Sequence, residues 1–421
     1  MKILYLYQHF VLPEKSGITR TFEFARRLVA MGHEIHLIAS DEDLNSRHSK
    51  PYIQIVNGIH IHLLPIPYHN SMGFFKRVMA FMKYICGAIR CGVHLDYDLV
   101  YASSPPLTTT LSAIFLARIK KIPLVLEVRD LWPDLPIAFG VLRDPFSIIL
   151  TKAIERLAYH SSAHVIALSP GIKRAITARG VKSENISFIP NSSDIESFRL
   201  GKDRNPSLPK GIDKEDLIVL YTGTLGIANG VSYICSLAKE TIHSHPHIKF
   251  VVIGDGKEKG LILNLAAQYQ VLGNNLFLLD PISKNEIPIF YRRASLILNT
   301  LINKKELWNA SPNKFFDALA AGRPIAINFR GWLADLILEN QIGLVLDPLD
   351  YKKAALQIVE ALSLPLWVEN RGRRALKLGA SHFDRDLLAE QLNEILIKVS
   401  GGVGRNRNTS VGKKWGNRPL S

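Results

Sequence analysis

The chain has 421 residues, of which 47% are hydrophobic and 21% charged, so it can form two domains of roughly 200 residues, each with its own core. Its 52 basic and 37 acidic residues give a net charge of +15, which favours an acidic partner but does not choose between nucleic acid, an anionic membrane surface and phosphorylated small molecules. The three cysteines, Cys86, Cys91 and Cys235, lack metal-ligand spacing and exclude a disulfide framework, which favours a reducing compartment.

The amino-terminal sequence MKILYLYQHF predicts a buried first strand. It has one lysine, lacks a small-residue cleavage site and turns polar at Gln8, so it does not fit a signal peptide. No run in the sequence approaches the ~20 apolar residues that span a bilayer. We therefore expect any membrane contact to be peripheral.

Residues 3–40 predict a β–α–β unit and hence a parallel sheet with a right-handed crossover. Gly17, in the first loop, leaves room for a ligand to approach the backbone, although ordinary turn chemistry explains it equally well. Arg20, just inside the following helix, suits an anion. The acidic run at 41–43 could hold a divalent ion, but we interpret it as solvated surface and predict no metal site.

The next segments predict a strand pair or extended excursion over 53–67 and a basic amphipathic helix over 72–93. This helix interleaves apolar residues with lysine and arginine, so it can lie in a membrane interface or pack on the sheet with its charges solvated. A strand over 124–128 then ends in Arg129 and Asp130. Because ligands bind beyond the carboxyl ends of parallel strands, these two residues are catalytic candidates.

A polar linker over 198–215 precedes a second β–α alternation of about six strands, which predicts a second Rossmann-like sheet. The last residues are basic and Gly-rich, and they contact anionic lipid or nothing specific. The predicted units are an amino-terminal Rossmann-like domain (1–200), a carboxy-terminal Rossmann-like domain (216–380), a helix that packs back on the first domain (381–400) and a disordered tail (401–421).

The stretch WNASPNKFFDALAAGRP, residues 308–324, predicts one short helix that starts after Ser311 and Pro312 and stops before Gly322. Its amino terminus offers backbone N–H groups to an anion, and Lys314 adds a positive charge. Asp317, further along, can accept hydrogen bonds from hydroxyl groups. A nucleotide-sugar has both an anionic diphosphate and hydroxyl groups, so it fits this site.

Further phosphate cradles follow strands of the second domain at Gly223-Thr224 and at Gly254. They do not resemble a Walker loop, and no G-x-G-x-x-G follows a strand, which disfavours P-loop phosphoryl transfer and dinucleotide-dependent redox chemistry. Two facing domains instead create a cleft that holds one substrate on each wall.

Several motifs in order, among them EVRDLWPD, SPGIKRAITARGV, FIPNSSDIESF, GDGKEK and SPNKFFDALAAGRPI, resemble the retaining GT-B glycosyltransferases of the family 4-like group. The resemblance covers roughly residues 1 to 400 and is closest to bacterial O-antigen and capsule N-acetyl-fucosamine transferases. It implies an α/β GT-B fold, a UDP-sugar donor bound mainly by the second domain, an acceptor bound by the first, and no metal or other cofactor.

The resemblance also implies residue roles. The amides of Ser311 to Lys314, with Pro312 and Asn313 between them, would neutralise the leaving diphosphate, and Asp317, the second acid of the family's E-x7-E motif, would hold the ribose. Asn309 stands where the first glutamate is expected. The candidate donor-binding residues are Gly17, Arg20, Gly223, Thr224, Gly254, Asn309, Ser311, Pro312, Asn313 and Asp317, and the candidate catalytic residues are Arg129, Asp130 and Lys314.

Two departures from the family bear on the substrate. The loop after the first strand of the second domain has Thr224 and Asn229 where the family often has arginine and lysine, and Lys314 and Arg20 would compensate. Arg129 replaces a histidine that the family uses at the C6 hydroxyl of the donor, which suggests a 6-deoxy-N-acetylamino sugar.

The leading hypothesis is sugar transfer from a UDP-sugar to a lipid-linked or saccharide acceptor in surface polysaccharide synthesis. The enzyme would act at the inner face of the cytoplasmic membrane, contact anionic lipid through 72–93 and bind no nucleic acid. Two alternatives remain: a 2-epimerase acting on UDP-N-acetylglucosamine, and a non-catalytic membrane-associated partner of a polysaccharide assembly complex.

Overall fold

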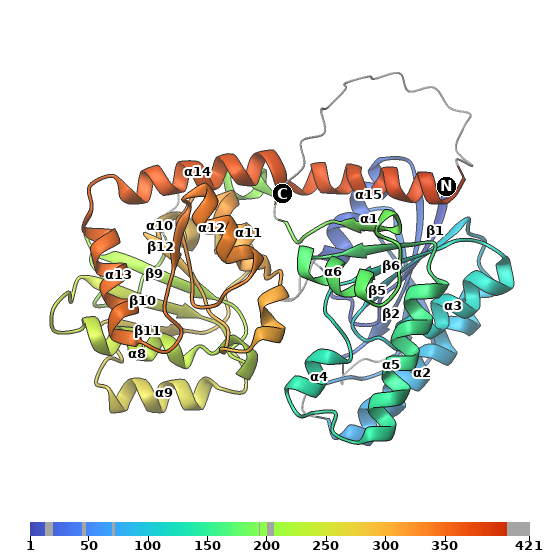
Figure 1. Cartoon of the computed structure of the whole chain (residues 1–421), viewed down its shortest axis with the longest axis horizontal. Coiled ribbons are helices and arrows are strands. Elements are labelled where there is room, and N and C mark those ends of the chain that lie inside the picture. Colours follow the sequence, from blue (N-terminus) through green and yellow to red (C-terminus); the bar gives the residue numbers. More distant parts are fainter. Residues whose placement is uncertain (13–19, 44–47, 70–71, 193, 200–205, 402–421) are drawn as a thin grey trace.

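The computed structural model describes residues 1–401 except 13–19, 44–47, 70–71, 193 and 200–205. Two α/β halves stand side by side, and two consecutive helices run along one side of both (Figure 1). Each half is built on a mainly parallel sheet, as the alternation of strands and helices in the sequence predicts. In the described part of the chain, no helix combines the length and the apolar character needed to cross a membrane.

The amino-terminal sheet has eight strands in the order β3-β4-β2-β1-β5-β6-β7-β8. All neighbours are parallel except β3 and β4, whose antiparallel pairing confirms the predicted strand pair over 53–67. The strands are β1 (Lys2–Leu6), β2 (Glu34–Asp41), β3 (Tyr52–Val56), β4 (Ile59–Pro65), β5 (Leu99–Ser104), β6 (Leu124–Val128), β7 (His164–Ala167) and β8 (Ile186–Phe188). The helices of this half are α1 (Arg20–Ala30), α2 (Phe74–Gly92), α3 (Thr109–Lys120), α4 (Asp134–Ala138), α5 (Pro145–Ser161), α6 (Pro170–Ala178) and the 3₁₀ turn η1 (Ser183–Asn185).

The carboxy-terminal sheet has six parallel strands in the order β11-β10-β9-β12-β13-β14, the number that the sequence predicts. The strands are β9 (Leu217–Thr222), β10 (Ile248–Ile253), β11 (Leu276–Leu279), β12 (Leu296–Asn299), β13 (Ile325–Ile327) and β14 (Gly343–Val345). Its helices are α7 (Ile195–Arg199), α8 (Ser232–Thr241), α9 (Lys259–Gln268), α10 (Ile287–Arg293), α11 (Asn313–Ala321), α12 (Trp332–Asn340), α13 (Tyr351–Ser363) and α14 (Trp367–His382), with 3₁₀ turns η2 (Ile227–Asn229) and η3 (Lys305–Asn309).

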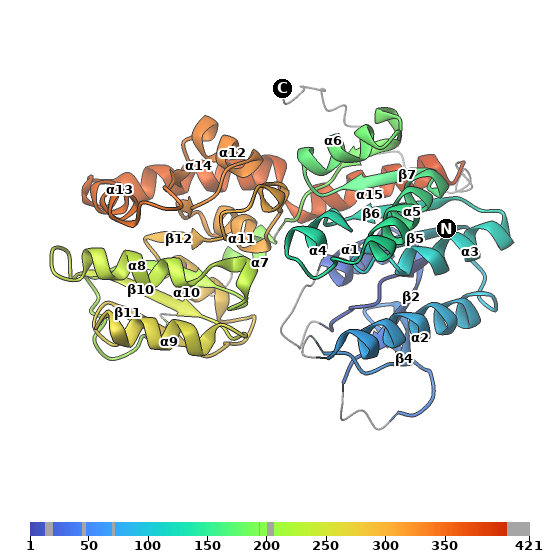
Figure 2. The same ribbon diagram turned by 60° about the horizontal axis from the view of Figure 1, so that its bottom comes forward.

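Two short segments cross between the halves. α7 lies within the range assigned to the first domain from sequence, yet Ile195 and Phe198 pack into the core of the second. The final helix α15 (Arg385–Val399) makes the opposite crossing, because its Leu388 and Leu392 are buried in the core of the first half beside α1. Figure 2 shows α14 and α15 running in succession from the second half to the first.

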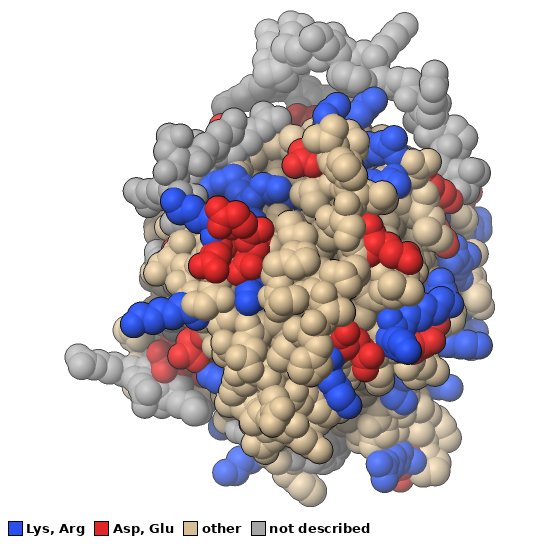
Figure 3. All heavy atoms as spheres, turned by 90° about the vertical axis from the view of Figure 1, so that its left-hand side faces the viewer, with Lys and Arg blue, Asp and Glu red and all other residues tan. Residues whose placement is uncertain are grey.

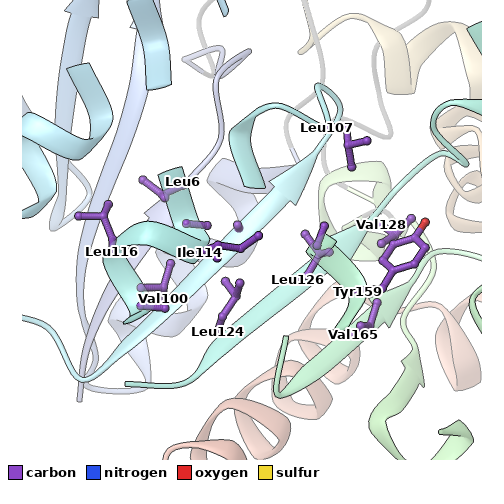
Figure 4. Close-up of a cluster of buried hydrophobic side chains, with 14 of the residues drawn as sticks. Leu6, Val100, Leu107, Ile114, Leu116, Leu124, Leu126, Val128, Tyr159 and Val165 are labelled. Carbon is purple, nitrogen blue, oxygen red and sulfur yellow. The ribbon is translucent and has the colours of Figure 1, made fainter. Parts of the chain in front are cut away.

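One of the two core layers of the amino-terminal half lies between its sheet and the helices α2, α3 and α5 (Figure 4), and the other lies on the opposite face of the sheet, beneath α1 and α15. The strands contribute nearly continuous apolar runs, which is the pattern of strands buried on both faces. Leu126 and Val100 are fully buried in this cluster, to which α3 contributes Ile114 and α5 contributes Tyr159. The strand ends on the cleft side are therefore held in fixed positions by packing.

A cluster of charged side chains joins the two halves near the start of α15. Glu23 of α1 accepts hydrogen bonds from Arg26 at 2.6 Å and Arg27 at 2.9 Å, and it lies 3.3 Å from Lys284 of the second half. Arg385 at the start of α15 lies 3.6 Å from Glu23 and 2.8 Å from Asp194. Because these groups come from α1, both crossing segments and the second half, their pairing ties the halves together.

This pairing lowers the pKa of Glu23. Burial would raise the pKa of the carboxyl, but the charges of Arg385, Arg26 and Lys284 and the hydrogen bond from Arg26 outweigh it and lower the pKa from 4.5 to about 2. A carboxyl with a lowered folded-state pKa adds stability above its unfolded pKa and loses it as the pH falls towards the folded value.

Replacing Glu23 with glutamine should lower the free energy of unfolding at pH 7 by about 3 kcal/mol, because Arg27 and Arg385 lose one of their anionic partners. The difference from wild type should shrink as the pH falls from 4.5 towards 2. Urea unfolding at a series of pH values measures both, with Glu390→Gln, at an exposed position on α15, as the control. Equal stability of wild type and Glu23→Gln at pH 7 would contradict the role of the cluster.

Candidate active site

The first turn of α11 carries a lysine at the carboxyl edge of the second sheet. Pro312 precedes the helix without a side-chain hydrogen bond to cap it, and Gly322, with φ +63°, ends it in the left-handed conformation. The Lys314 ammonium lies 3.9 Å above the centre of the Tyr221 ring. A Cβ atom built on Gly223 would lie 3.1 Å from the same nitrogen. Lys314 therefore faces exposed backbone where β9 ends.

Gly223 and Gly254 form a close contact between two neighbouring loops. A Cβ on Gly254 would lie 1.9 Å from the Gly223 carbonyl oxygen, so no larger residue fits there without movement of the backbone. Thr224 is exposed, and its carbonyl accepts hydrogen bonds from Tyr221 and from Asn229 at 2.9 Å. The side chain of Asn229 thus forms a hydrogen bond within its own loop.

Lys314 and Asp317, which lie one helical turn apart on α11, both have shifted pKa values. Burial lowers the pKa of Lys314 to about 7, and the nearby Asp317 offsets this only in part. Burial raises the pKa of Asp317 to about 7 against the lowering effect of Arg385, Lys284 and Lys314. In the part of the chain that the structure describes, the neighbouring charges do not outweigh the effect of burial on either group. An arriving anion would restore the charge on Lys314.

Two of the predicted donor-binding residues contact the opposite half. The Ser311 hydroxyl accepts a hydrogen bond from the backbone N–H of Asn191 at 3.2 Å, and its carbonyl accepts one from the Asn191 side chain. Asn309, on η3, lies against the start of α6, where a Cβ on Gly171 would come 1.7 Å from its Oδ1 atom. Ser311 and Asn309 therefore stand where the two walls meet.

In the amino-terminal half, Arg20 does not face a ligand as the sequence predicted. Its guanidinium is buried, lies 2.9 Å from the Glu127 carboxylate and donates hydrogen bonds to the carbonyls of Ile189 and Pro190. Because these partners occupy its donors, the expectation that Arg20 receives a phosphate is wrong. The other proposed contact in that loop, Gly17, lies outside the described residues.

Arg129 and Asp130 follow β6 at the edge of the same sheet. The Arg129 guanidinium lies 4.9 Å from the centre of the Tyr7 ring, and its Nη1 atom is buried without a hydrogen-bond partner among the described residues. Burial works against the charged form, but Tyr7 and Glu127 outweigh it and raise the pKa of Arg129. Burial raises the pKa of Asp130. Arg129 thus keeps a donor that a substrate oxygen could satisfy.

Two residues that the sequence did not single out belong to the same strand edges. Asn299, the last residue of β12, and Gln8, just after β1, are fully buried, and neither side chain has a hydrogen-bond partner in the described structure. Such orphaned polar groups indicate positions that a ligand or water completes. Their position at strand ends was the available signal, since ligands of parallel sheets bind beyond the carboxyl ends of the strands.

The acidic run at 41–43 is occupied by protein contacts. Tyr52 donates a hydrogen bond to Asp41 at 3.0 Å, and the His9 ring lies 2.5 Å from Glu42. Over the residues that the structure describes, no group of three or more His, Cys, Asp and Glu side chains could hold a metal ion.

Solved structures with the same architecture cover nearly the whole chain. Sucrose-phosphate synthase from Thermosynechococcus elongatus is 15% identical, with a TM-score of 0.76 over 95% of this chain and 99% of that one. Anabaena Alr3699/HepE, solved in complex with UDP and glucose, is 17% identical, with a TM-score of 0.67 over 94% of this chain and 100% of that one. Both likenesses show the fold.

Sequence comparisons assign the two halves separately. A protein of Escherichia coli K12, provisionally named the colanic acid biosynthesis glycosyl transferase WcaI, is 24% identical over 339 residues, which are 76% of this chain and 82% of that protein. Residues 17–192 match the glycosyl transferase 4-like domain, and residues 206–377 match the glycosyl transferases group 1. The chain therefore belongs to the glycosyltransferases that join these two domains in a GT-B fold.

Proposed function

We propose that this glycosyltransferase moves a sugar from a UDP-sugar to its acceptor with retention of anomeric configuration, in the synthesis of a surface polysaccharide of the O-antigen or capsule type. The observation that carries the proposal is the Lys314 ammonium held against the bare backbone of Gly223 at the start of α11. This combination of a helix amino terminus and a cation suits a diphosphate. The UDP in the HepE complex and the name of WcaI support the donor and the pathway.

In the proposed reaction, the bond between the anomeric carbon and the diphosphate oxygen breaks, and the acceptor oxygen bonds to the same face of that carbon. The proton of the acceptor hydroxyl passes to the leaving diphosphate. The first-turn amides of α11 and Lys314 stabilise the negative charge that develops on the leaving UDP. Asp317 accepts hydrogen bonds from the ribose hydroxyls. Asn309 contributes a neutral amide near the sugar, so it orients hydroxyl groups without balancing positive charge on the sugar ring. The UDP-sugar is a substrate, and we propose no additional cofactor.

Features of the amino-terminal half support the proposed donor sugar and acceptor. Arg129 is buried, and its Nη1 atom, which has no hydrogen-bond partner among the described residues, can donate to a carbonyl oxygen such as that of an N-acetylamino sugar. We propose that this sugar lacks a C6 hydroxyl, because an arginine stands where the family has the histidine that contacts that group. The proposed acceptor is lipid-linked, or a saccharide carried on such a lipid, and the enzyme meets it at the inner face of the cytoplasmic membrane through residues 72–93.

Replacing Lys314 with alanine should lower kcat by about 10²–10³-fold, because the leaving diphosphate loses its cationic partner. Release of UDP measured with saturating donor and acceptor gives this value. Lys352→Ala, at an exposed lysine on α13, is the matched control and should keep wild-type turnover. Near-wild-type turnover of Lys314→Ala would refute the role of this lysine.

Binding of UDP should weaken as the pH rises from 7 to 9, by up to about tenfold per pH unit. Above its pKa of about 7 Lys314 is mostly neutral in the free enzyme, so binding a diphosphate must take up a proton. Calorimetry in buffers of different ionisation heat measures the affinity and the proton uptake. Lys314→Met should reduce both, and an affinity independent of pH in the wild type would contradict the assignment.

A panel of UDP-sugars tested with membrane extract, followed by mass spectrometry of the lipid product, identifies the donor. We expect transfer of a 6-deoxy-N-acetylamino sugar, and Arg129→His should shift the preference towards donors with a C6 hydroxyl. Use of an ordinary hexose or hexosamine with refusal of the deoxy sugar would overturn the donor proposal. UDP-N-acetylglucosamine without acceptor is the control for the epimerase alternative, because only an epimerase converts the donor alone.

A further inference from the structure

The helix α2 exposes an apolar stripe that the fold does not bury. Its other side is held in the core, where Tyr84 is fully buried and donates a hydrogen bond to the Ile38 carbonyl at 2.9 Å. Val78, Met79 and Met82 are 40%, 58% and 50% exposed, and their spacing places them on one side of the helix. One side of α2 therefore packs on the sheet, as one of the two interpretations predicted, and the other side exposes apolar residues to solvent.

The helix α5 carries a second apolar stripe with the same character. Phe146, Ile149, Leu150 and Leu157 are 73%, 68%, 50% and 41% exposed, and they recur at helical spacing. The sequence did not single out this helix. Scattered surface apolar residues need no explanation, but a continuous stripe of this length indicates a contact surface.

The helix α3 joins the two stripes into one face, because it packs against both α2 and α5. Phe115 and Ile119 of α3 are exposed. An open groove of about 390 Å³ lies along α3 beside α5 and is lined by Leu111, Ile114, Phe115, Arg118 and Ile119 of α3 and by Leu157 of α5. We call the exposed surface of α2, α3 and α5 the three-helix face.

The charge of the three-helix face is almost entirely positive. The three helices contain eight lysine and arginine residues and one acid, Glu155, which is buried and paired with Arg179 at 3.0 Å. By contrast, acidic and basic side chains occur together on the outer end of the carboxy-terminal half (Figure 3). Apolar stripes bordered by lysine and arginine match an anionic bilayer, which offers an apolar interior beneath a negative surface.

The direction of the helices relates this face to the cleft. α2 has 19 residues and α5 has 17, which correspond to roughly 25–29 Å, whereas the five- or six-residue strands β5 and β6 span about 17–20 Å. Both helices follow strands whose carboxyl ends face the cleft, so their first turns extend past the sheet on the substrate side. In Figure 1 both begin at the lower edge of the amino-terminal half.

We propose that the three-helix face docks on an anionic phospholipid bilayer, with α5 as a second anchor beside α2 and with the α3–α5 groove receiving a hydrocarbon chain. The inserted residues are the exposed apolar side chains of α2 and α5, and the lysines and arginines beside them contact lipid phosphates. This placement brings the acceptor wall of the cleft to the membrane surface. The role that we give to this docking rests on the proposed lipid-linked acceptor, whereas the docking itself does not require sugar transfer.

The test is co-sedimentation of the full chain with vesicles of phosphatidylcholine, alone or with one third phosphatidylglycerol. We expect binding to the anionic vesicles that weakens with salt. The variant Phe146→Ser with Ile149→Ser on α5, and the variant Met79→Ser with Met82→Ser on α2, should each lower the partition coefficient by about tenfold or more. Leu349→Ser with Leu356→Ser, at positions 70% and 55% exposed on the other half, is the matched control and should bind as wild type.

Wild-type vesicle binding by the α5 variant, or equal binding of wild type to neutral vesicles, would overturn the proposal. If wild type is a dimer and the α5 variant a monomer with unchanged vesicle binding, the face is instead a contact between two copies of the chain. Thermal unfolding checks that the variants are folded. Vesicle binding without sugar transfer would refute the proposed function and leave the docking proposal intact. Sugar transfer to a soluble acceptor without vesicle binding would refute the docking proposal and leave the transferase activity intact.

Discussion

The buried carboxylate of Glu127 is the fixed point on which the cleft depends. It accepts hydrogen bonds from Tyr101 at 2.8 Å and Ser103 at 2.7 Å and pairs with Arg20. A buried charge is tolerated only when its partners are complete, because an unpaired ion in the interior costs several kcal/mol. This requirement fixes the end of β6, the start of α1 and the chain that leaves β8 in one arrangement.

From that point a chain of polar contacts reaches the donor helix. Arg20 lies within 3.4 Å of the Asn191 side chain, and Asn191 in turn donates two hydrogen bonds to Ser311, just before α11. The position of the phosphate-binding helix is thus connected to the sheet of the opposite half. Together with the Glu23 cluster, these contacts set how the two walls face each other.

The sequence predicted the elements of the fold well and the roles of some residues poorly. The second sheet of six strands, the strand pair over 53–67 and the short helix after Pro312 followed from hydrophobic periodicity and from Pro and Gly signals, which act over a few residues. Arg20 failed because a positive charge at a helix start looks the same from sequence whether its partner is a ligand phosphate or Glu127, 107 residues away. Asn299 and Gln8 were missed because burial without a partner is not visible in a sequence.

By itself, the sequence determined the α/β class, the two Rossmann-like halves and the family, since strand and helix periodicity and the order of motifs are local properties of the chain. Only the tertiary structure decided that Lys314 faces Gly223, that α7 packs into the second half, and that α2, α3 and α5 share one basic, apolar face. Each of these depends on contacts between residues far apart in the chain, and packing selects them only when the whole core forms.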